Sequence, residues 1–226
     1  YMEPDDFLDS LRKLLNKEET AYQFRDDDLR PLANAALSTE KIVYKNKCIY
    51  LKQDYDNEKG FAALMAHRLY CDMARQGATA PPEIVCGDHT PSEEQREAVI
   101  AALQHNTFIL TGFPGTGKTT VLQMIIQSFV KQKGRGCSIL LCAPTGRAAR
   151  RMAEATGYDA CTIHRAFGLG GEDDATTYTS PTGELELVVV DEVSMLDMWL
   201  ANPMIQRSGI DPKLVFVGDK DQPPCG

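Results

Sequence analysis

The sequence has no apolar run that approaches the roughly 18 residues of a membrane-spanning helix, so we do not expect an integral membrane protein. The first residues, Tyr1 to Asp6, are acidic and lack the basic-then-apolar pattern of a signal peptide, which predicts a cytosolic protein. Positive charge is not in excess either, because 24 Lys and Arg stand against 32 Asp and Glu, for a formal net charge of −8. This balance argues against a protein that coats nucleic acid through bulk charge, but it allows a local basic groove.

Paired cysteines are missing as well. The seven cysteines are scattered, none lies in a C-x-x-C pair, and their number is odd. We therefore expect reduced thiols rather than a zinc site or a disulfide framework. The remaining composition, with 43% hydrophobic and 25% charged residues in 226, suits a globular chain of one domain or two small ones.

Residues 1–88 differ in texture from the rest of the chain. Apolar periodicity, a proline in a first helical turn, and two β-prone runs around Lys45-Asn46-Lys47 indicate a small, mostly helical domain with a β-hairpin. A winged-helix arrangement and a plain packing or linker domain both fit this order. The predicted elements are a helix over 7–15, a helix over 28–37, a hairpin over 42–51 and a helix over 58–76.

Residues 89–226 show alternating strand and helix patterns instead. The predicted strands are apolar on both faces, which is typical of a parallel sheet covered by helices on both sides, so we expect an α/β domain. The segment 168–183 is rich in Gly, Asp, Thr and Ser and is predicted to be a loop. The predicted elements are helices over 92–103, 119–131 and 146–155 and strands over 107–110, 138–143, 185–190 and 214–217.

Residues 112–119, Gly-Phe-Pro-Gly-Thr-Gly-Lys-Thr, fit the phosphate-loop pattern G-x-x-x-x-G-K-[ST] in full, between a predicted strand and a predicted helix. The glycines let backbone N–H groups curl around an anion, and the helix start adds partial positive charge. Lys118 is expected to reach the β- and γ-phosphates of ATP, and the Thr119 hydroxyl to bind Mg²⁺. The predicted ATP-binding residues of this segment are Gly112, Pro114, Gly115, Thr116, Gly117, Lys118, Thr119 and Thr120.

A second acidic signal follows the apolar run 187–190, which ends in Asp191 and Glu192. In a P-loop fold the first carboxylate holds the Mg²⁺ shell, so Asp191 is the second predicted metal ligand. Glu192 is expected to activate a water for attack on the γ-phosphate, because adjacent side chains at a strand end point in different directions. Taken alone, the pair would also fit a solvated acidic turn.

Five further segments occur in the order found in superfamily-one helicases, and residues 86–226 resemble the RecD-like branch of that family. Residues 90–96 look like its glutamine motif, in which Gln95 would hydrogen-bond the adenine edge. Residues 143–149, Ala-Pro-Thr-Gly-Arg-Ala-Ala, look like a motif that touches single-stranded DNA, and 162–165 resemble its Thr-x-His segment. The resemblance implies DNA contacts by Pro144, Thr145, Gly146, Arg147, Thr162 and His164. Arg147, Arg150 and Arg151 form the densest basic cluster, which would also fit a solvated helix face.

The last two segments are more specific. Residues 191–197, Asp-Glu-Val-Ser-Met-Leu-Asp, are similar to the family's extended acidic motif D-E-[AV]-S-M-[LV]-D. Residues 217–224 resemble G-D-x-D-Q-L-P, in which Gln222 would sense the γ-phosphate and couple it to DNA. The family has a Leu between that Gln and the first Pro, whereas Pro223 follows Gln222 directly here. Such motors need two RecA-like domains, and the chain stops at Gly226, so we expect a fragment without the second domain and its arginine finger.

The resemblance implies a RecA-like motor domain over 89–226 that hydrolyses ATP with Mg²⁺, moves 5′ to 3′ on single-stranded DNA and unwinds duplex in a bacterial-type cytosol. Lys118, Glu192 and Gln222 would be the catalytic residues, and recombination or repair proteins the partners. Three alternatives stay open. They are a P-loop NTPase that remodels proteins, a RecD-type subunit of a recombination exonuclease (the alpha chain of exodeoxyribonuclease V), and a module whose residues 1–88 dock to protein or DNA.

Overall fold

The structure is a computed structural model, and it describes residues 4–15, 26–75, 82–87, 90–169 and 184–219. Contacts gather the chain into two compact units, Tyr1–Gly60 and Phe61–Gly226, which are described separately here. The division falls inside a helix, whereas the sequence predicts a domain boundary at residue 88. That boundary stays a prediction, because residues 76–81 and 88–89 lie outside the described part of the chain.

The first unit contains the predicted β-hairpin. Its strands pair antiparallel, with Val43 opposite Tyr50. The two turn residues, Asn46 and Lys47, have φ angles of 51° and 65°. A two-residue loop with both angles positive has the twist that suits a tight hairpin. The unit consists of α1 (Pro4–Leu15), α2 (Asp26–Leu37), β1 (Ile42–Lys45), β2 (Cys48–Leu51) and the first residues of α3 (Lys52–Arg75).

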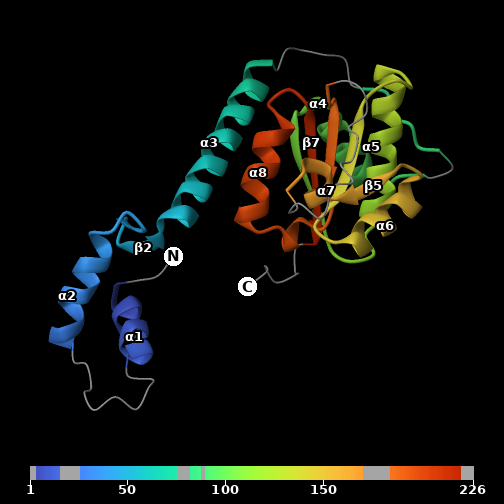
Figure 1. The fold of residues 1–226 in the computed structure, drawn as a ribbon. Helices are drawn as coiled ribbons and strands as arrows, with labels where there is room; N and C mark the ends of the chain where they lie inside the picture. Colours follow the sequence, from blue (N-terminus) through green and yellow to red (C-terminus); the bar gives the residue numbers. More distant parts are fainter. Residues whose placement is uncertain (1–3, 16–25, 76–81, 88–89, 170–183, 220–226) are drawn as a thin grey trace. The chain divides into compact units, whose positions relative to one another are not determined.

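The second unit alternates strands and helices and confirms the predicted α/β class. Figure 1 shows α8 on one side of its sheet and α5 on the other. After the second part of α3, its elements are α4 (Glu93–Gln104), β3 (Thr107–Gly112), α5 (Lys118–Lys133), β4 (Ile139–Ala143), α6 (Gly146–Thr156), β5 (Ala160–Thr162), α7 (Ile163–Phe167), β6 (Leu187–Val190), the 3-10 helix η2 (Val193–Met195), α8 (Met198–Ser208) and β7 (Lys213–Asp219).

The sheet has five parallel strands in the order β3-β7-β6-β4-β5. In a parallel sheet all carboxyl ends meet at one edge, which is where ligands bind in open α/β folds. At this edge Gly112 of β3 pairs with Asp219 of β7, and Ala143 of β4 pairs with Thr162 of β5. The register therefore sets the phosphate loop beside Asp219 and the two predicted DNA-facing segments beside each other.

The central strands of the sheet are buried on both faces, to which alternate residues of each strand point. In β6, Leu187 and Val189 belong to one apolar cluster and Val188 and Val190 to the other, and all four are 0% exposed. The first cluster includes side chains of α4, α5 and α6, and the second includes α7, α8 and the second part of α3. This arrangement confirms the prediction of helices on both faces.

Local signals predicted some elements and missed others. Ser92 and Gln95 form a reciprocal capping box that begins α4, close to the start of the helix predicted over 92–103. Sequence periodicity did not predict β5 and α7, which have only 3 and 5 residues and so show too little of a period. It also missed α8, which contains Pro203, a residue that normally ends a helical pattern. Of the predicted loop 168–183, all but the first two residues lie outside the described part.

The second part of α3 is held to the sheet by a buried polar cluster. Arg68 is 2% exposed, and its guanidinium donates to the carbonyl oxygens of Gly209 at 2.5 Å and of Pro212. It also donates to Thr107 Oγ1 at 3.3 Å and to the Asn106 carbonyl at 3.4 Å. These acceptors lie at the start of β3 and before β7, at the opposite edge of the sheet from the phosphate loop. In the described part of the chain no helix, α3 included, has the length and apolarity to cross a membrane.

Candidate nucleotide-binding site

The phosphate loop joins β3 to α5 and requires glycine for its backbone. Gly115 and Gly117 have φ angles of 79° and 83°, which L side chains rarely adopt. Space is short as well, since a Cβ at Gly117 would lie 2.8 Å from Gln95 Nε2 and one at Gly112 2.8 Å from Thr116 Oγ1. No side chain caps α5, whose N-cap is Gly117. The first N–H groups of this helix are therefore left for an anion.

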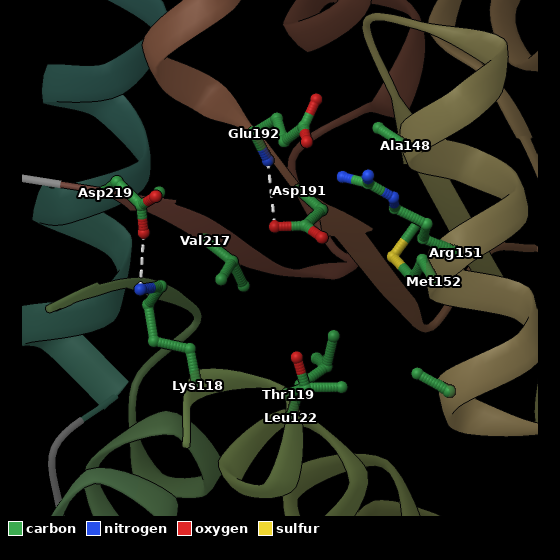
Figure 2. A pocket seen from close by; sticks show the side chains of 12 residues that line it. Lys118, Thr119, Leu122, Ala148, Arg151, Met152, Asp191, Glu192, Val217 and Asp219 are labelled. Atoms are coloured by element: carbon green, nitrogen blue, oxygen red, sulfur yellow. Dashed lines mark hydrogen bonds and ion pairs between the residues drawn. The ribbon is translucent and has the colours of Figure 1, made fainter. Parts of the chain in front are cut away.

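Lys118 crosses the loop and pairs with an acidic residue. Its ammonium donates to the carbonyl oxygens of Gly112 at 3.0 Å and Phe113 at 2.9 Å, and it forms an ion pair with Asp219. Figure 2 shows this pair at one side of the pocket. The Lys118 and Asp219 side chains are 16% and 19% exposed, so solvent screens the pair less than a surface pair. A polyphosphate bound in the loop would compete with Asp219 for the lysine.

Asp191 and Glu192 leave the buried end of β6 with their carboxylates separated. Asp191 Oδ1 accepts a hydrogen bond from the Glu192 N–H at 2.8 Å. Burial raises the pKa of Asp191; the Glu192 N–H opposes that effect, the Asp219 carboxylate adds to it, and Lys118 lowers it. Glu192 has φ 53° and ψ 42°, a left-handed conformation that is uncommon for a residue with a side chain. Figure 2 shows its carboxylate pointing away from that of Asp191.

These residues surround a cavity of about 210 Å³ at the carboxyl-end edge of the sheet. Figure 2 shows Thr119 opposite Asp191, with Lys118 and Asp219 on one side and Arg151 on the other. The cavity is lined by Lys118, Thr119, Leu122, Ala148, Arg151, Met152, Ala155, Asp191, Glu192, Val217, Gly218 and Asp219. The structure thus brings the predicted lysine, both predicted metal ligands and the predicted general base to one pocket.

The oxygen donors of this pocket fit Mg²⁺. The Thr119 hydroxyl and the Asp191 carboxylate face one cavity, and both are hard oxygen ligands. Mg²⁺ usually keeps several waters and is held by one or two carboxylates together with substrate phosphates. Among the described residues there is no cluster of three or more His, Cys, Asp or Glu side chains that could hold a metal. A metal held largely by nucleotide phosphates needs no such cluster.

Gln95 lies against the phosphate loop. Its Nε2 donates to the Thr116 carbonyl at 3.4 Å, while its Oε1 accepts the Ser92 N–H at 3.1 Å. The amide therefore bridges the start of α4 and the loop. Its contact with adenine stays a prediction. The other predicted loop residues, Gly112, Pro114, Gly115, Thr116 and Gly117, form the loop itself, and Thr120 lies in α5 and does not line the cavity.

The predicted DNA-facing residues gather at the ends of β4 and β5. The Thr145 and Thr162 hydroxyls each accept the N–H three residues later, at 3.2 and 3.3 Å, and so cap α6 and α7. Each hydroxyl keeps its proton for donation to another acceptor. A Cβ on Gly146 would lie 4.0 Å from Thr162 Cγ2, so the two segments are in contact distance. All six residues are accessible: Pro144, Thr145 and Thr162 are partly exposed, and Gly146, Arg147 and His164 are exposed.

The structure adds two residues that were not assigned to the pocket from the sequence, Arg151 and Asp219. Asp219 lies in the recognised segment 217–224, but its pairing with Lys118 depends on the β3–β7 register. Arg151 belongs to the basic cluster, and its spacing from Ala148 and Ala155 on α6 is a signal that could have separated it from Arg150. Gln222, the third predicted catalytic residue, lies outside the described residues.

The second unit is similar to known proteins. Residues 95–226 match the family model of the AAA domain. The ATP-dependent RecD2 DNA helicase of Deinococcus radiodurans is 37% identical over 133 residues, which cover 59% of this chain and 18% of that protein. The RecBCD enzyme subunit RecD of Buchnera aphidicola subsp. Schizaphis graminum is 23% identical over 235 residues, which cover 96% of this chain and 39% of that protein.

Among solved structures, the Pif1 helicase from Candida albicans matches with a TM-score of 0.44 and 24% identity, covering 61% of this chain and 34% of that one. The chain spans only part of its curated relatives, 18% of the length of the Deinococcus RecD2 helicase and 39% of that of the Buchnera RecD subunit.

Proposed function

The chain belongs to the AAA domain family and has a RecD-like superfamily-one helicase motor domain, and from this premise we propose that it is the ATP-binding part of a DNA helicase. The protein would hydrolyse ATP, move 5′ to 3′ along single-stranded DNA and unwind duplex. The observation that carries the proposal is the convergence of Lys118, Thr119, Asp191 and Glu192 on one cavity at the carboxyl-end edge of a parallel sheet.

Binding of nucleotide follows from the loop and its lysine. The N–H groups at the start of α5 would surround the phosphates, and Lys118 would exchange the Asp219 carboxylate for phosphate oxygens. Thr119 and Asp191 would hold Mg²⁺, which neutralises charge on the phosphates when it is bound. Burial favours the protonated form of Asp191. A bound cation would oppose this effect by favouring the carboxylate.

Hydrolysis would depend on Glu192. Its left-handed backbone directs the carboxylate away from Asp191, so one group can hold the metal shell while the other accepts a proton from the attacking water. Neither task interferes with the other. Hydrolysis by this chain alone should be slow, because arginine fingers contribute roughly 10³ to 10⁵ in rate in other P-loop enzymes and the family takes its finger from a second motor domain.

Contacts with single-stranded DNA would come from the ends of β4 and β5. The Thr145 and Thr162 hydroxyls can donate to phosphate oxygens, and exposed Arg147 and His164 lie in the same two segments. Binding that rests on phosphates should weaken with salt and show no base specificity. Coupling of the γ-phosphate to DNA through Gln222 belongs to the same proposal.

A second candidate is a RecD-type subunit of a recombination nuclease. It is favoured by the extent of the match, because the Buchnera RecD alignment covers 96% of the chain and the RecD2 alignment 59%. Unwinding by the purified protein alone would favour the stand-alone helicase. Unwinding that needs added nuclease subunits would favour the second candidate, and recombination proteins would then be its partners.

The test is the steady-state ATPase rate of the full-length protein with and without a single-stranded DNA oligonucleotide. We expect strong stimulation by DNA, and loss of nucleotide binding in a Lys118→Ala variant that keeps its fold. ATPase activity that ignores DNA would reject the helicase and leave an NTPase that remodels proteins as the better explanation.

A further inference from the structure

The three arginines of α6 have different surroundings. Ala148, Met152 and Ala155 line the nucleotide cavity, and Arg151 lines it with them. Residues three and four apart share a helix face, so Arg151 lies on the same stripe as Ala148 and Ala155. Both Arg150 and Arg151 are exposed, but Arg150 does not line the cavity, and its Nε donates to Glu154 Oε1 at 3.0 Å.

Arg151 reaches toward the catalytic carboxylates. Figure 2 shows its guanidinium extending from α6 toward the Asp191 carboxylate, on the opposite side of the pocket from Lys118. Within the described part of the chain the Arg151 side chain has no hydrogen bond or ion pair, although Arg150 and Lys118 both have one. An arginine fork without partners therefore faces the space between the metal-binding and water-activating residues.

The charge of the pocket shows what this guanidinium fits. Asp191, Glu192 and Asp219 bring three carboxylates, and Lys118 and Arg151 bring two cations. Lys118 is already held by Asp219 and by the loop carbonyls. A guanidinium presents a planar fork of donors that matches phosphate oxygens, and it keeps its charge at any pH of interest. A nucleotide bound in the phosphate loop would extend its terminal phosphate toward Asp191 and Glu192, and Arg151 lies beside these two residues.

We propose that Arg151 binds the terminal phosphate of the nucleotide and makes this pocket prefer a nucleoside triphosphate to a diphosphate. The inference rests on the proposed function, because it assumes that the cavity binds nucleotide. It assigns Arg151 to nucleotide rather than to the DNA-facing surface, where Arg147 remains. The contact comes from the same domain as the phosphate loop, so it exists before any second motor domain closes on the site.

The test is a titration of this chain with Mg²⁺ and either a slowly hydrolysed ATP analogue, ATPγS, or ADP, followed by isothermal calorimetry. Because a hydrogen bond to a charged group is a strong one, Arg151→Ala should weaken ATPγS binding by about tenfold or more. ADP binding should stay close to that of the unchanged chain. Arg151→Lys, which keeps the charge without the fork, should fall between the two. Arg150→Ala is the matched control on the same helix and should leave both affinities unchanged.

Three results would overturn the inference. Equal losses of ATPγS and ADP binding in Arg151→Ala would place the side chain away from the terminal phosphate. Unchanged nucleotide binding with weaker binding of a single-stranded oligonucleotide would assign Arg151 to the DNA surface. If the unchanged chain bound neither nucleotide, the proposed function itself would fall and the inference with it, which is a different outcome from loss of the Arg151 effect alone.

Discussion

Replacement of Arg68 by alanine should release the second part of α3 from the sheet. The guanidinium of Arg68 donates to acceptors at the start of β3 and before β7, and it is 2% exposed. Truncation removes these hydrogen bonds and leaves buried carbonyl groups with fewer donors. The neighbouring Asp72 accepts the Asn106 N–H at 2.9 Å and cannot replace a donor.

The size of the effect follows from the two shortest bonds, to the Gly209 and Pro212 carbonyls. A hydrogen bond to a charged group contributes about 1.5–3 kcal/mol, so the two together contribute about 3–6 kcal/mol. Water that enters the emptied space will donate hydrogen bonds to some of these carbonyl groups. We therefore expect the free energy of unfolding to fall by about 3–4 kcal/mol. Against a typical total stability of about 5–15 kcal/mol, that loss should be easy to measure.

The assay is urea unfolding of the 226-residue chain by circular dichroism, together with amide hydrogen exchange in residues 61–75. Arg68→Ala should lower the midpoint and speed exchange in that segment, while Arg68→Lys, with one donor group on a flexible stem, should lie between. Arg96→Ala removes an exposed arginine of α4 and should change stability by no more than about 0.5 kcal/mol. A loss below about 1 kcal/mol for Arg68→Ala, with unchanged exchange, would refute the reasoning.

Three further predictions concern the pocket. Glu192→Gln should keep ATP binding and abolish hydrolysis in the full-length enzyme, and an ATPase rate equal to wild type would remove Glu192 from the catalytic residues. Gly117→Ala should cost about 1–2 kcal/mol in thermal or urea unfolding for its left-handed φ. It should cost somewhat more because the Gln95 amide must shift and give up its hydrogen bond to the Thr116 carbonyl. Gly115→Ala should show only the conformational cost because nothing lies within 4 Å of its Cβ, and equal losses would contradict a role for Gln95. The pKa of Asp191 is raised in the folded chain, so protonation there begins at a higher pH than for an ordinary Asp. As the pH is lowered, Mg²⁺-dependent nucleotide affinity should therefore begin to fall before ordinary carboxylates are protonated. The raised pKa also means that ionisation of Asp191 lowers the stability of the folded chain as the pH rises. Asp191→Asn should therefore lose metal-dependent binding but gain stability near neutral pH in urea unfolding. A less stable variant would contradict this sign.

Motifs that are contiguous in the chain could be predicted from the sequence alone. The phosphate loop is one run of residues, and the glycine spacing there prescribes its backbone, so Lys118 and Thr119 could be named directly. The strand that ends in Asp191 and Glu192 is also local, as is the capping box at Ser92. Apolar runs without alternation were enough to predict a parallel sheet covered on both faces.

Contacts between residues far apart in the chain could be seen only in the folded protein, because strand order and register cannot be derived from local periodicity. The β3–β7 register brings Asp219 to Lys118, and the packing of α6 separates Arg151 from Arg150. The anchor at Arg68 depends on acceptors up to 144 residues away. From the sequence alone, Lys118, Asp219 and Arg68 would be expected to be solvated, and they gain their partners only after the strands have assembled.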